Sequence, residues 1–285
     1  MKIGVSMAFG HFTAREYIVE AARYLDESGI DSLWAPEHVL FFPEYASRYP
    51  YTQDGKIPGN PKGILDPFSA LTFAAAVTER LRLGTGVCLV PQRNPVYTAR
   101  VVADLDYLSN GRFDFGVGIG WLREEFENLQ MNFTERGKRT IEYIEVMRAL
   151  WARGVSEFKG DTYELQPCYA NPNPVQQPHP PIIFGGESEA ALARVASHGN
   201  GWYGFNRSPS SAARGIEKLE RHLQRAGRSR ADIRLFIGSD AESVDQASFD
   251  AYRDLGIDQL IVPLGVGSID QLRRRVQDLL KFAGR

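Results

Sequence analysis

Two glycines followed by Glu187 and Ser188 form the stretch of this chain that is best suited to bind an anion. The sequence there is "FGGESEAALARVASHG", an apolar run that changes into a helix pattern. Gly185 and Gly186 let the backbone turn tightly, and Glu187 or Ser188 then begins a helix whose first N–H groups have no partner inside the helix. These donors and the helix dipole favour an anion, so we expect phosphate at Gly185, Gly186 and Ser188. An ordinary turn into a helix capped by Ser188 explains the same residues.

Glycines also interrupt an apolar strand pattern between residues 80 and 100, "RLRLGTGVCLVPQRNPVYTAR". Gly84 and Gly86 break the run, and Pro91 ends it. Glycine inside a strand loses a packing side chain, and it usually marks a bulge or the close approach of another group to the backbone. We expect one of these two features at this strand.

Acid–base and metal chemistry have few candidates elsewhere. Glu37 and His38 end the apolar run "DSLWAPEH", and the five histidines of the chain lack the spacing of a metal-dependent hydrolase, so no metal is expected. No lysine stands at an expected strand end, which disfavours a Schiff-base enzyme. A glycosidase needs two carboxylates across a cavity, and Glu37 with Glu124 or Glu125 leaves that alternative open.

Composition limits the class of protein. The chain has 285 residues, of which 43% are apolar, and its net charge is -2. This length suits one large domain over residues 1–285, and the balanced charge predicts no nucleic-acid partner. Two cysteines are too few for a disulfide framework, and no apolar run has membrane-spanning length. We therefore expect a cytoplasmic protein that binds neither membranes nor nucleic acids.

Strand and helix patterns alternate along the whole chain. Amphipathic helices are predicted, among others, at 15–29, 66–79, 94–111 and 136–151. The expected strands lie at 2–9, 31–38, within 80–100, and at 112–120, 181–186, 201–205, 233–239 and 258–265.

Eight strands that each precede a helix predict a (β/α)8 TIM barrel. An open doubly wound sheet is the main alternative, but it would carry a glycine fingerprint after its first strand, where this chain has "AFGHFTAR". In a barrel the chemistry lies at the carboxyl ends of the strands, and these ends are rich in glycine and aromatic residues here. They include the 116, 118 and 120 glycines, Trp121 and His11.

Two segments exceed a minimal barrel. Residues 40–63 follow the second strand and are rich in Phe, Tyr, Pro and Gly, which favours an aromatic lid over the barrel mouth, although an ordered surface loop without a role fits too. Residues 156–180 contain a hairpin pattern around Gly160 and then several prolines. We interpret them as a surface insertion before the fifth strand.

Five stretches together resemble the bacterial luciferase-like monooxygenase superfamily, in particular its coenzyme F420-dependent oxidoreductase branch. They are "DSLWAPEH", "LRLGTGVCLVPQRNPVYTAR", "LDYLSNGRFDFGVGIGWLREEFE", "ERGKRTIEYIEVMRALW" and "PIIFGGESEAALARVASHGNGW". Their order is highly specific for the superfamily and less so for the cofactor.

The resemblance implies that a flavin or deazaflavin ring lies against the end of the third strand. Members of the superfamily have a non-proline cis peptide bond there, and the matching bond joins Gly86 to Val87. Gly118 and Gly120 at the end of the fourth strand complete the implied ring site. The alternative is a trans bulge that only curves the barrel.

The resemblance also implies roles for other strand-end residues. Glu37 and His38 would lie beside the reacting face, where the imidazole exchanges a proton and the neighbouring carboxylate sets its tautomer. Trp121 and His11 would contact substrate. Trp121 stands where some sugar-phosphate dehydrogenases of the family have glutamate, which argues against that activity. Three arginines, Arg93, Arg123 and Arg207, would meet an anionic cofactor tail.

The implied reaction is hydride transfer between reduced coenzyme F420 and a small organic substrate, by a homodimer. An FMN-dependent monooxygenase that uses reduced flavin and oxygen is the alternative, and a cofactor-binding protein without turnover is a third possibility.

Overall fold

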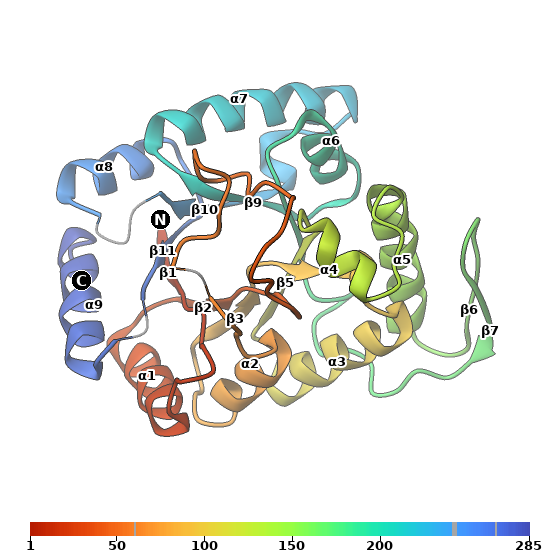
Figure 1. Ribbon diagram of the computed structural model, residues 1–285, viewed down its shortest axis with the longest axis horizontal. Coiled ribbons are helices and arrows are strands. Elements are labelled where there is room, and N and C mark those ends of the chain that lie inside the picture. The colour runs from red at the N-terminus through yellow and green to blue at the C-terminus, as the bar shows by residue number, and fades with distance from the viewer. Residues whose placement is uncertain (60, 241–243, 266) are drawn as a thin grey trace.

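The computed structural model describes residues 1–59, 61–240, 244–265 and 267–285. Within these residues, eight parallel strands form a closed barrel surrounded by helices (Figure 1). β3 pairs with β2 on one side and with β5 on the other, which closes the ring and confirms the predicted (β/α)8 barrel. The barrel strands are β1 (Lys2–Ser6), β2 (Ser32–Ala35), β3 (Arg82–Thr85) with its continuation β4 (Cys88–Leu89), β5 (Phe113–Gly118), β8 (Ile182–Gly185), β9 (Gly201–Arg207), β10 (Arg234–Ser239) and β11 (Gln259–Pro263).

Helices follow the barrel strands in order. They are α1 (Arg15–Ser28), α2 (Pro67–Ala75), α3 (Pro95–Leu108), α4 (Arg123–Asn128), α5 (Arg136–Trp151), α6 (Glu189–His198), α7 (Pro209–Arg225), α8 (Gln246–Asp254) and α9 (Ile269–Phe282), with short 3-10 turns at Val90–Gln92 and Arg230–Asp232. Local chemistry sets their starts, because Asp66 and Asn94 each precede a proline and accept a first-turn N–H bond at 2.9 Å. The start of the helix predicted at 66–79 is therefore confirmed.

Apolar side chains form two cores. The larger core lies between the strands and the outer helices, and a smaller one fills the inside of the barrel. The inner core consists of Trp34, Ile183, Tyr203, Phe236 and Ile261. A Cβ on Gly84 would clash with the indole of Trp34, so the group that approaches this glycine is a side chain of the protein's own core.

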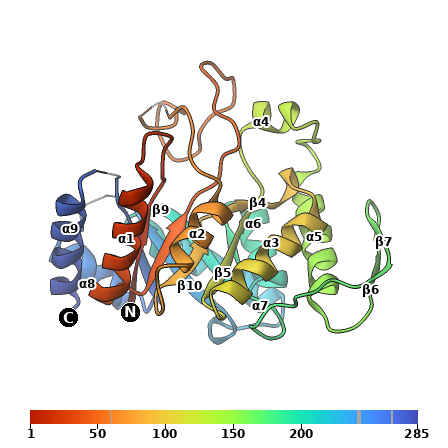
Figure 2. The ribbon, with the colours of Figure 1, turned by 90° about the horizontal axis from the view of Figure 1, so that it is seen from below.

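The two predicted insertions leave the barrel in different places. Residues 40–63, of which residue 60 lies outside the described part, rise with α4 above the carboxyl ends of the strands (Figure 2). We call residues 40–63 the lid. β6 (Ser156–Lys159) and β7 (Glu164–Cys168) form an antiparallel hairpin that projects beside α5, as the pattern around Gly160 predicts (Figure 1).

Candidate functional site

The third barrel strand breaks between β3 and β4 at a cis peptide bond from Gly86 to Val87, which confirms that expectation. Val87 packs where two neighbouring strands lack side chains. A Cβ on Gly118 would lie 2.5 Å from one methyl of Val87, and a Cβ on Gly185 would lie 3.1 Å from the other. Three of the expected cofactor-binding positions therefore meet at the carboxyl end of the barrel, around the side chain of Val87.

Gly86 and Gly120 have different neighbours. A Cβ on Gly86 would lie 3.4 Å from the hydroxyl oxygen of Tyr203, inside the barrel. Gly120 has φ 76°, and a Cβ there would lie 2.7 Å from the ring of Phe126. Gly120 therefore gives room to the ring of Phe126, whereas a Cβ on Gly86 would make only an ordinary contact.

The turn from β8 into α6 has the glycine geometry that the sequence predicts. Gly186 has φ 105°, in the left-handed region that favours glycine. Ser188, and not Glu187, caps α6, because its hydroxyl accepts a hydrogen bond from the N–H of Ala191 at 3.1 Å. The capping reading is therefore confirmed, while phosphate binding at this turn stays a prediction.

Glu187 turns its carboxylate into the mouth and meets the lid. It accepts hydrogen bonds from the Tyr51 hydroxyl and from the N–H of Phe205, both at 3.0 Å. Burial raises the pKa of Glu187 above its usual value, although both hydrogen bonds act in the opposite direction. A carboxylate therefore joins the lid to the strand ends β8 and β9.

Glu37 has a different position from the expected one. It is 4% exposed, and it accepts hydrogen bonds from the N–H of Leu89 and from Arg93 Nε, the latter at 2.6 Å. Arg93 also donates to Asp66 at 2.6 Å. A buried carboxylate needs such partners, so Glu37 and Arg93 brace the bulged strand. The expectations that Glu37 sets the tautomer of His38 and that Arg93 is free for an anionic tail are therefore wrong.

The carboxylate that contacts His38 belongs to Glu125. His38 Nδ1 lies 3.2 Å from Glu125 Oε2, and the side chain of Glu125 is fully buried. Burial favours the protonated acid, but hydrogen bonds from His38, Gln92 and Leu40 bring the pKa of Glu125 below its usual value. Glu125 is therefore an ionised group on α4, eighty-seven residues from His38 in sequence.

Aromatic rings cover His38. The ring centroids of Trp121 and His38 are 5.9 Å apart, and Tyr45 and Tyr49 of the lid lie 5.9 Å and 5.2 Å from Trp121. The ring centroid of Phe41 lies 5.1 Å from that of His38. The predicted lid over the mouth is thus confirmed, with Trp121 between it and His38.

His11 lies apart from this cluster. Its ring contacts the neighbouring Phe12, which is 89% exposed, at 3.8 Å. No contact in the described part of the chain joins His11 to Trp121 or His38. The structure therefore does not bring the two expected substrate-contacting residues together.

Three arginines, one each from α4, α5 and α6, lie close enough for their charges to act on one another. Arg123 and Arg136 both lie over the ring of Phe133, at 4.5 Å and 3.7 Å, and Arg136 donates to the carbonyl of Gly120. Burial and the charge of Arg136 lower the pKa of Arg194, which lies on α6. None of the three arginines has a carboxylate partner within the described ranges. We call Arg123, Arg136 and Arg194 the rim arginines.

Arg207, the third arginine expected at a cofactor tail, donates to the carbonyl of Ser211 at the start of α7. Its Nε is buried without a partner in the described part of the chain. The structure therefore places it at the end of β9, where its charge acts to lower the pKa of Glu187.

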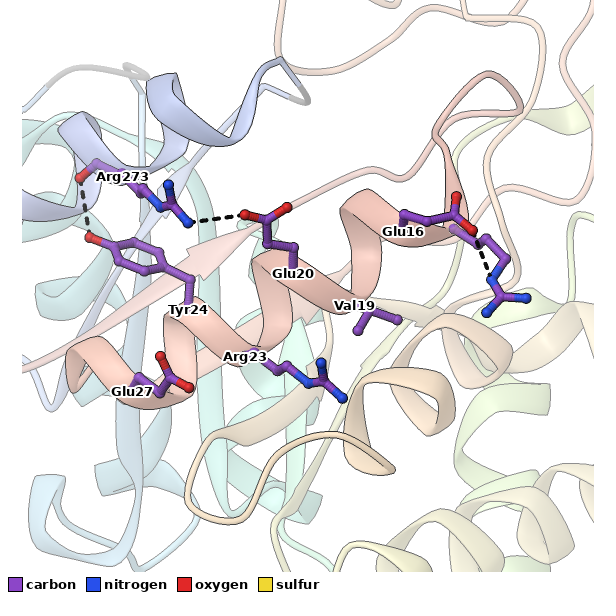
Figure 3. Close-up of a pocket in the computed structure, with 8 residues that line it drawn as sticks. Glu16, Val19, Glu20, Arg23, Tyr24, Glu27 and Arg273 are labelled. Carbon is purple, nitrogen blue, oxygen red and sulfur yellow. Dashed lines mark hydrogen bonds and ion pairs between the residues drawn. The ribbon is translucent and has the colours of Figure 1, made fainter.

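A surface groove lies on the outer wall of the barrel, far from the strand ends. Its lining comes from α1 and α9, and Arg273 donates to Glu20 at 3.0 Å while Tyr24 donates to the Arg273 carbonyl (Figure 3). The charges that line it largely pair with one another, so we assign it no chemistry. The described residues contain no group of three His, Cys, Asp or Glu side chains that could hold a metal ion, and no helix among them is long and apolar enough to span a membrane.

Sequence reasoning did not predict the contacts that four residues make at the site. Glu125, Gln92, Glu187 and Tyr51 act through partners that are distant in sequence. Glu187 follows the glycine-rich end of β8, and Glu125 lies on α4, the helix after the glycines that end β5. These positions were the available signal. The density of tyrosine in the lid was the signal for Tyr51.

Comparison with known proteins places this geometry in a family. The family model for luciferase-like monooxygenases matches residues 1–251. The chain belongs to this family. An uncharacterized protein of Mycobacterium tuberculosis is 30% identical over 291 residues, which cover 99% of this chain and 98% of that protein.

Other relatives in the family match over part of their length. A second uncharacterized protein of Mycobacterium tuberculosis is 35% identical over 184 residues, so this chain spans 65% of its length. Pyrimidine monooxygenase RutA of Pseudomonas syringae is 30% identical over 218 residues, which cover 73% of this chain and 60% of RutA.

Solved structures of the same fold include proteins with either cofactor in their descriptions. Monooxygenase RslO1 of Streptomyces bottropensis has a TM-score of 0.80 at 20% identity, covering 99% of this chain and 98% of that one. The coenzyme F420-dependent tetrahydromethanopterin reductase of Methanopyrus kandleri has a TM-score of 0.76 at 16% identity, covering 99% and 100%. A Pseudomonas putida diketocamphane monooxygenase in complex with FMN has a TM-score of 0.65 at 17% identity, covering 84% and 66%. At these identities the likeness shows the fold alone.

Proposed function

We propose that this chain is a coenzyme F420-dependent oxidoreductase that transfers hydride between the reduced deazaflavin and a small organic substrate beneath the lid. Membership of the luciferase-like family supports a flavin or deazaflavin enzyme. The residues fit a flat ring at the mouth, because Gly118 and Gly185 leave the side chain of Val87 as a surface between strand ends. When bound there, the deazaflavin supplies the hydride.

The rim arginines are the observation that favours the deazaflavin over FMN. Both cofactors have a ribityl phosphate, so a phosphate site at Gly185, Gly186 and Ser188 does not distinguish them. Only the deazaflavin continues into a tail of carboxylates. Arg136 bonds to the carbonyl of Gly120 at the end of β5, and Arg194 lies on the helix that begins at Ser188. Positive charge without carboxylate partners therefore lies beside the proposed phosphate turn, where such a tail would leave the mouth.

The side chains of the mouth exchange the proton, exclude water and hold the lid closed. His38 exchanges the proton that accompanies hydride transfer, since an imidazole can do so near neutral pH. Trp121, Tyr45 and Tyr49 cover the site and exclude water from it. Tyr51 fastens the lid to Glu187. The substrate then lies between the lid aromatics and Val87.

An FMN-dependent monooxygenase is the second candidate. The aromatic cover over His38 favours it as well, because oxygen activation on a reduced flavin needs a site protected from water. The resemblance to RutA is in keeping with this reading. To separate the two candidate functions, the protein is loaded with reduced deazaflavin or with reduced FMN and then mixed with oxygen. Rapid oxidation of the FMN form, coupled to formation of an oxygenated product, supports the monooxygenase.

The test of the proposal is parallel calorimetric titration of the protein with coenzyme F420 and with FMN at low and high salt. Exposed ionic contacts contribute about 0.2 to 1 kcal/mol each, so we expect a tens-fold preference for the deazaflavin at low salt, which shrinks as salt rises. Arg194→Gln should weaken binding of the deazaflavin several-fold and leave FMN unchanged. Arg153→Gln, at an exposed position after α5, is the matched control. Tighter binding of FMN at low salt would overturn the choice of cofactor.

A further inference from the structure

Glu125 is the most completely satisfied carboxylate at the mouth. Its side chain is 0% exposed, and its two oxygens accept four hydrogen bonds. Oε1 accepts from the N–H groups of Val39 and Leu40 at 2.6 Å and 3.0 Å. Oε2 lies 3.0 Å from Gln92 Nε2 and 3.2 Å from His38 Nδ1. Two separate segments of the chain, residues 38–40 and Gln92, therefore donate to the carboxylate of Glu125.

The protonation of Glu125 determines which nitrogen of His38 carries hydrogen. A carboxylate that accepts four hydrogen bonds is held ionised, and an ionised carboxylate can only accept. The hydrogen between Oε2 and Nδ1 therefore belongs to His38. In the neutral imidazole the other nitrogen, Nε2, is then the acceptor, as in pairs where a carboxylate orients a histidine.

We propose that Glu125 is a positioning residue that holds neutral His38 as the Nδ1–H tautomer and so leaves Nε2 free to exchange a proton at the mouth. The tautomer follows from the contacts of Glu125, whereas its use in turnover rests on the proposed function. Nε2 of His38 has no hydrogen-bond partner in the described part of the chain. The rings of Phe41 and Trp121 pack against the imidazole, with centroids 5.1 Å and 5.9 Å away.

A purely structural role for Glu125 is the competing explanation. Val39 and Leu40 need an acceptor to order the start of the lid, and any carbonyl oxygen at that place would serve them. The structural role depends on Oε1, and the positioning role depends on Oε2 and its charge. A substitution that keeps an acceptor at the position of Oε1 and changes the group at the position of Oε2 therefore separates the two roles.

Glu125→Gln is that substitution. Its carbonyl oxygen can still accept from Val39 and Leu40, while its amide presents N–H to His38 Nδ1 and reverses the tautomer. Gln92 can adapt by turning its amide, because its Oε1 is buried without a partner in the described residues. Glu127→Gln, at an exposed position on the same helix, is the matched control.

The experiment is 15N NMR of histidine-labelled protein without cofactor, at a pH where the imidazoles are neutral, with His38 assigned from a His38→Asn variant. We expect the native protein and Glu127→Gln to show Nδ1 protonated and Glu125→Gln to show Nε2 protonated. His222 is an internal reference of the opposite kind, because it meets Glu189 through Nε2 at 2.8 Å. A native His38 protonated at Nε2, or an unchanged tautomer in folded Glu125→Gln, overturns the proposal.

Kinetics connects the tautomer to the proposed reaction. In Glu125→Gln we expect kcat for deazaflavin-dependent turnover to fall about 10²-fold, with KM within a few-fold of the native value. The expected loss is that of general acid–base catalysis by His38. Equal kcat in folded Glu125→Gln and native enzyme would refute the use of Nε2 in turnover. If the protein binds no deazaflavin but the NMR result holds, the proposed function fails while the tautomer assignment stands.

Discussion

His38 is the residue on which the proposed chemistry depends most. His38→Asn keeps a donor for Glu125 and removes the imidazole, so the fold should persist while proton exchange is lost. We expect turnover to fall about 10²-fold or more with deazaflavin affinity within a few-fold, measured by steady-state kinetics and calorimetry. His222→Asn, on the outer helix α7, is the control. Native turnover in His38→Asn would return His38 to a structural role.

The carboxylates show how far single residues can be predicted from sequence. Glu37 precedes His38 in the chain, and adjacency suggested that the two act together. Successive residues of an extended segment point in opposite directions, and Glu37 points to Arg93 and the bulged strand. Glu125 comes from α4, after the fourth barrel strand, and meets His38 only after the barrel closes. The type of chemistry was therefore predictable, but the partner was not.

The hydrogen bond from Tyr51 to Glu187 predicts how firmly the lid is held to the barrel. Tyr51→Phe keeps the ring contact with Phe205 at 4.8 Å and removes the hydrogen bond to Glu187. Loss of about 1 kcal/mol corresponds to roughly five-fold more frequent opening. We expect trypsin to cleave after Arg48 and Lys56 several-fold faster than in the native protein.

The control for the lid is Tyr97→Phe, at a position on α3 that is 77% exposed. Its cleavage should match that of the native protein. If Tyr51→Phe is cleaved no faster than this control, the hydrogen bond to Glu187 does not hold the lid.

Strands and helices were predictable because their apolar periodicity and caps are local. The predicted helix 15–29 is α1 (Arg15–Ser28), and the predicted strand 181–186 is β8 (Ile182–Gly185). The contacts of the lid were not predictable, because its sequence has neither the 3.6-residue period of a helix nor the two-residue period of a strand. Its aromatic content indicated that it covers the mouth but not that Tyr51 meets Glu187.

At the scale of the whole barrel, Gly84 tests how tightly the interior is filled. Gly84→Ala places a methyl group against the buried indole of Trp34, so the side chain or the strand must shift. Overpacking of this kind costs about 1 to 3 kcal/mol. We expect that loss in the free energy of unfolding measured with denaturant.

Gly10→Ala is the matched control for Gly84→Ala, since a Cβ there meets no described atom closer than the carbonyl oxygen of Gly63 at 3.7 Å. It should change the free energy by no more than about 0.5 kcal/mol. Equal stability of the two variants would mean that the interior has room that the structure does not show.

Closure of the barrel was predictable from eight strand and helix pairs, whereas the filling of its interior was not. The strand glycines at 84 and 86 had suggested either a bulge or a close approach. Both occur, since Gly84 makes room for Trp34 and Gly86 begins the cis bond to Val87. A pattern of residue types indicates that space is needed, but only the assembled barrel shows what fills it.

The positions of the four tryptophans allow the state of the mouth to be followed by tryptophan fluorescence. Trp34, Trp151 and Trp202 are at most 2% exposed, whereas Trp121 is only partly buried beneath the lid tyrosines. A dissolved quencher such as acrylamide therefore reaches the Trp121 indole before the other three. The intrinsic fluorescence of the unlabelled protein then follows opening of the lid, and a bound ring beside Trp121 should dim that emission in proportion to occupancy.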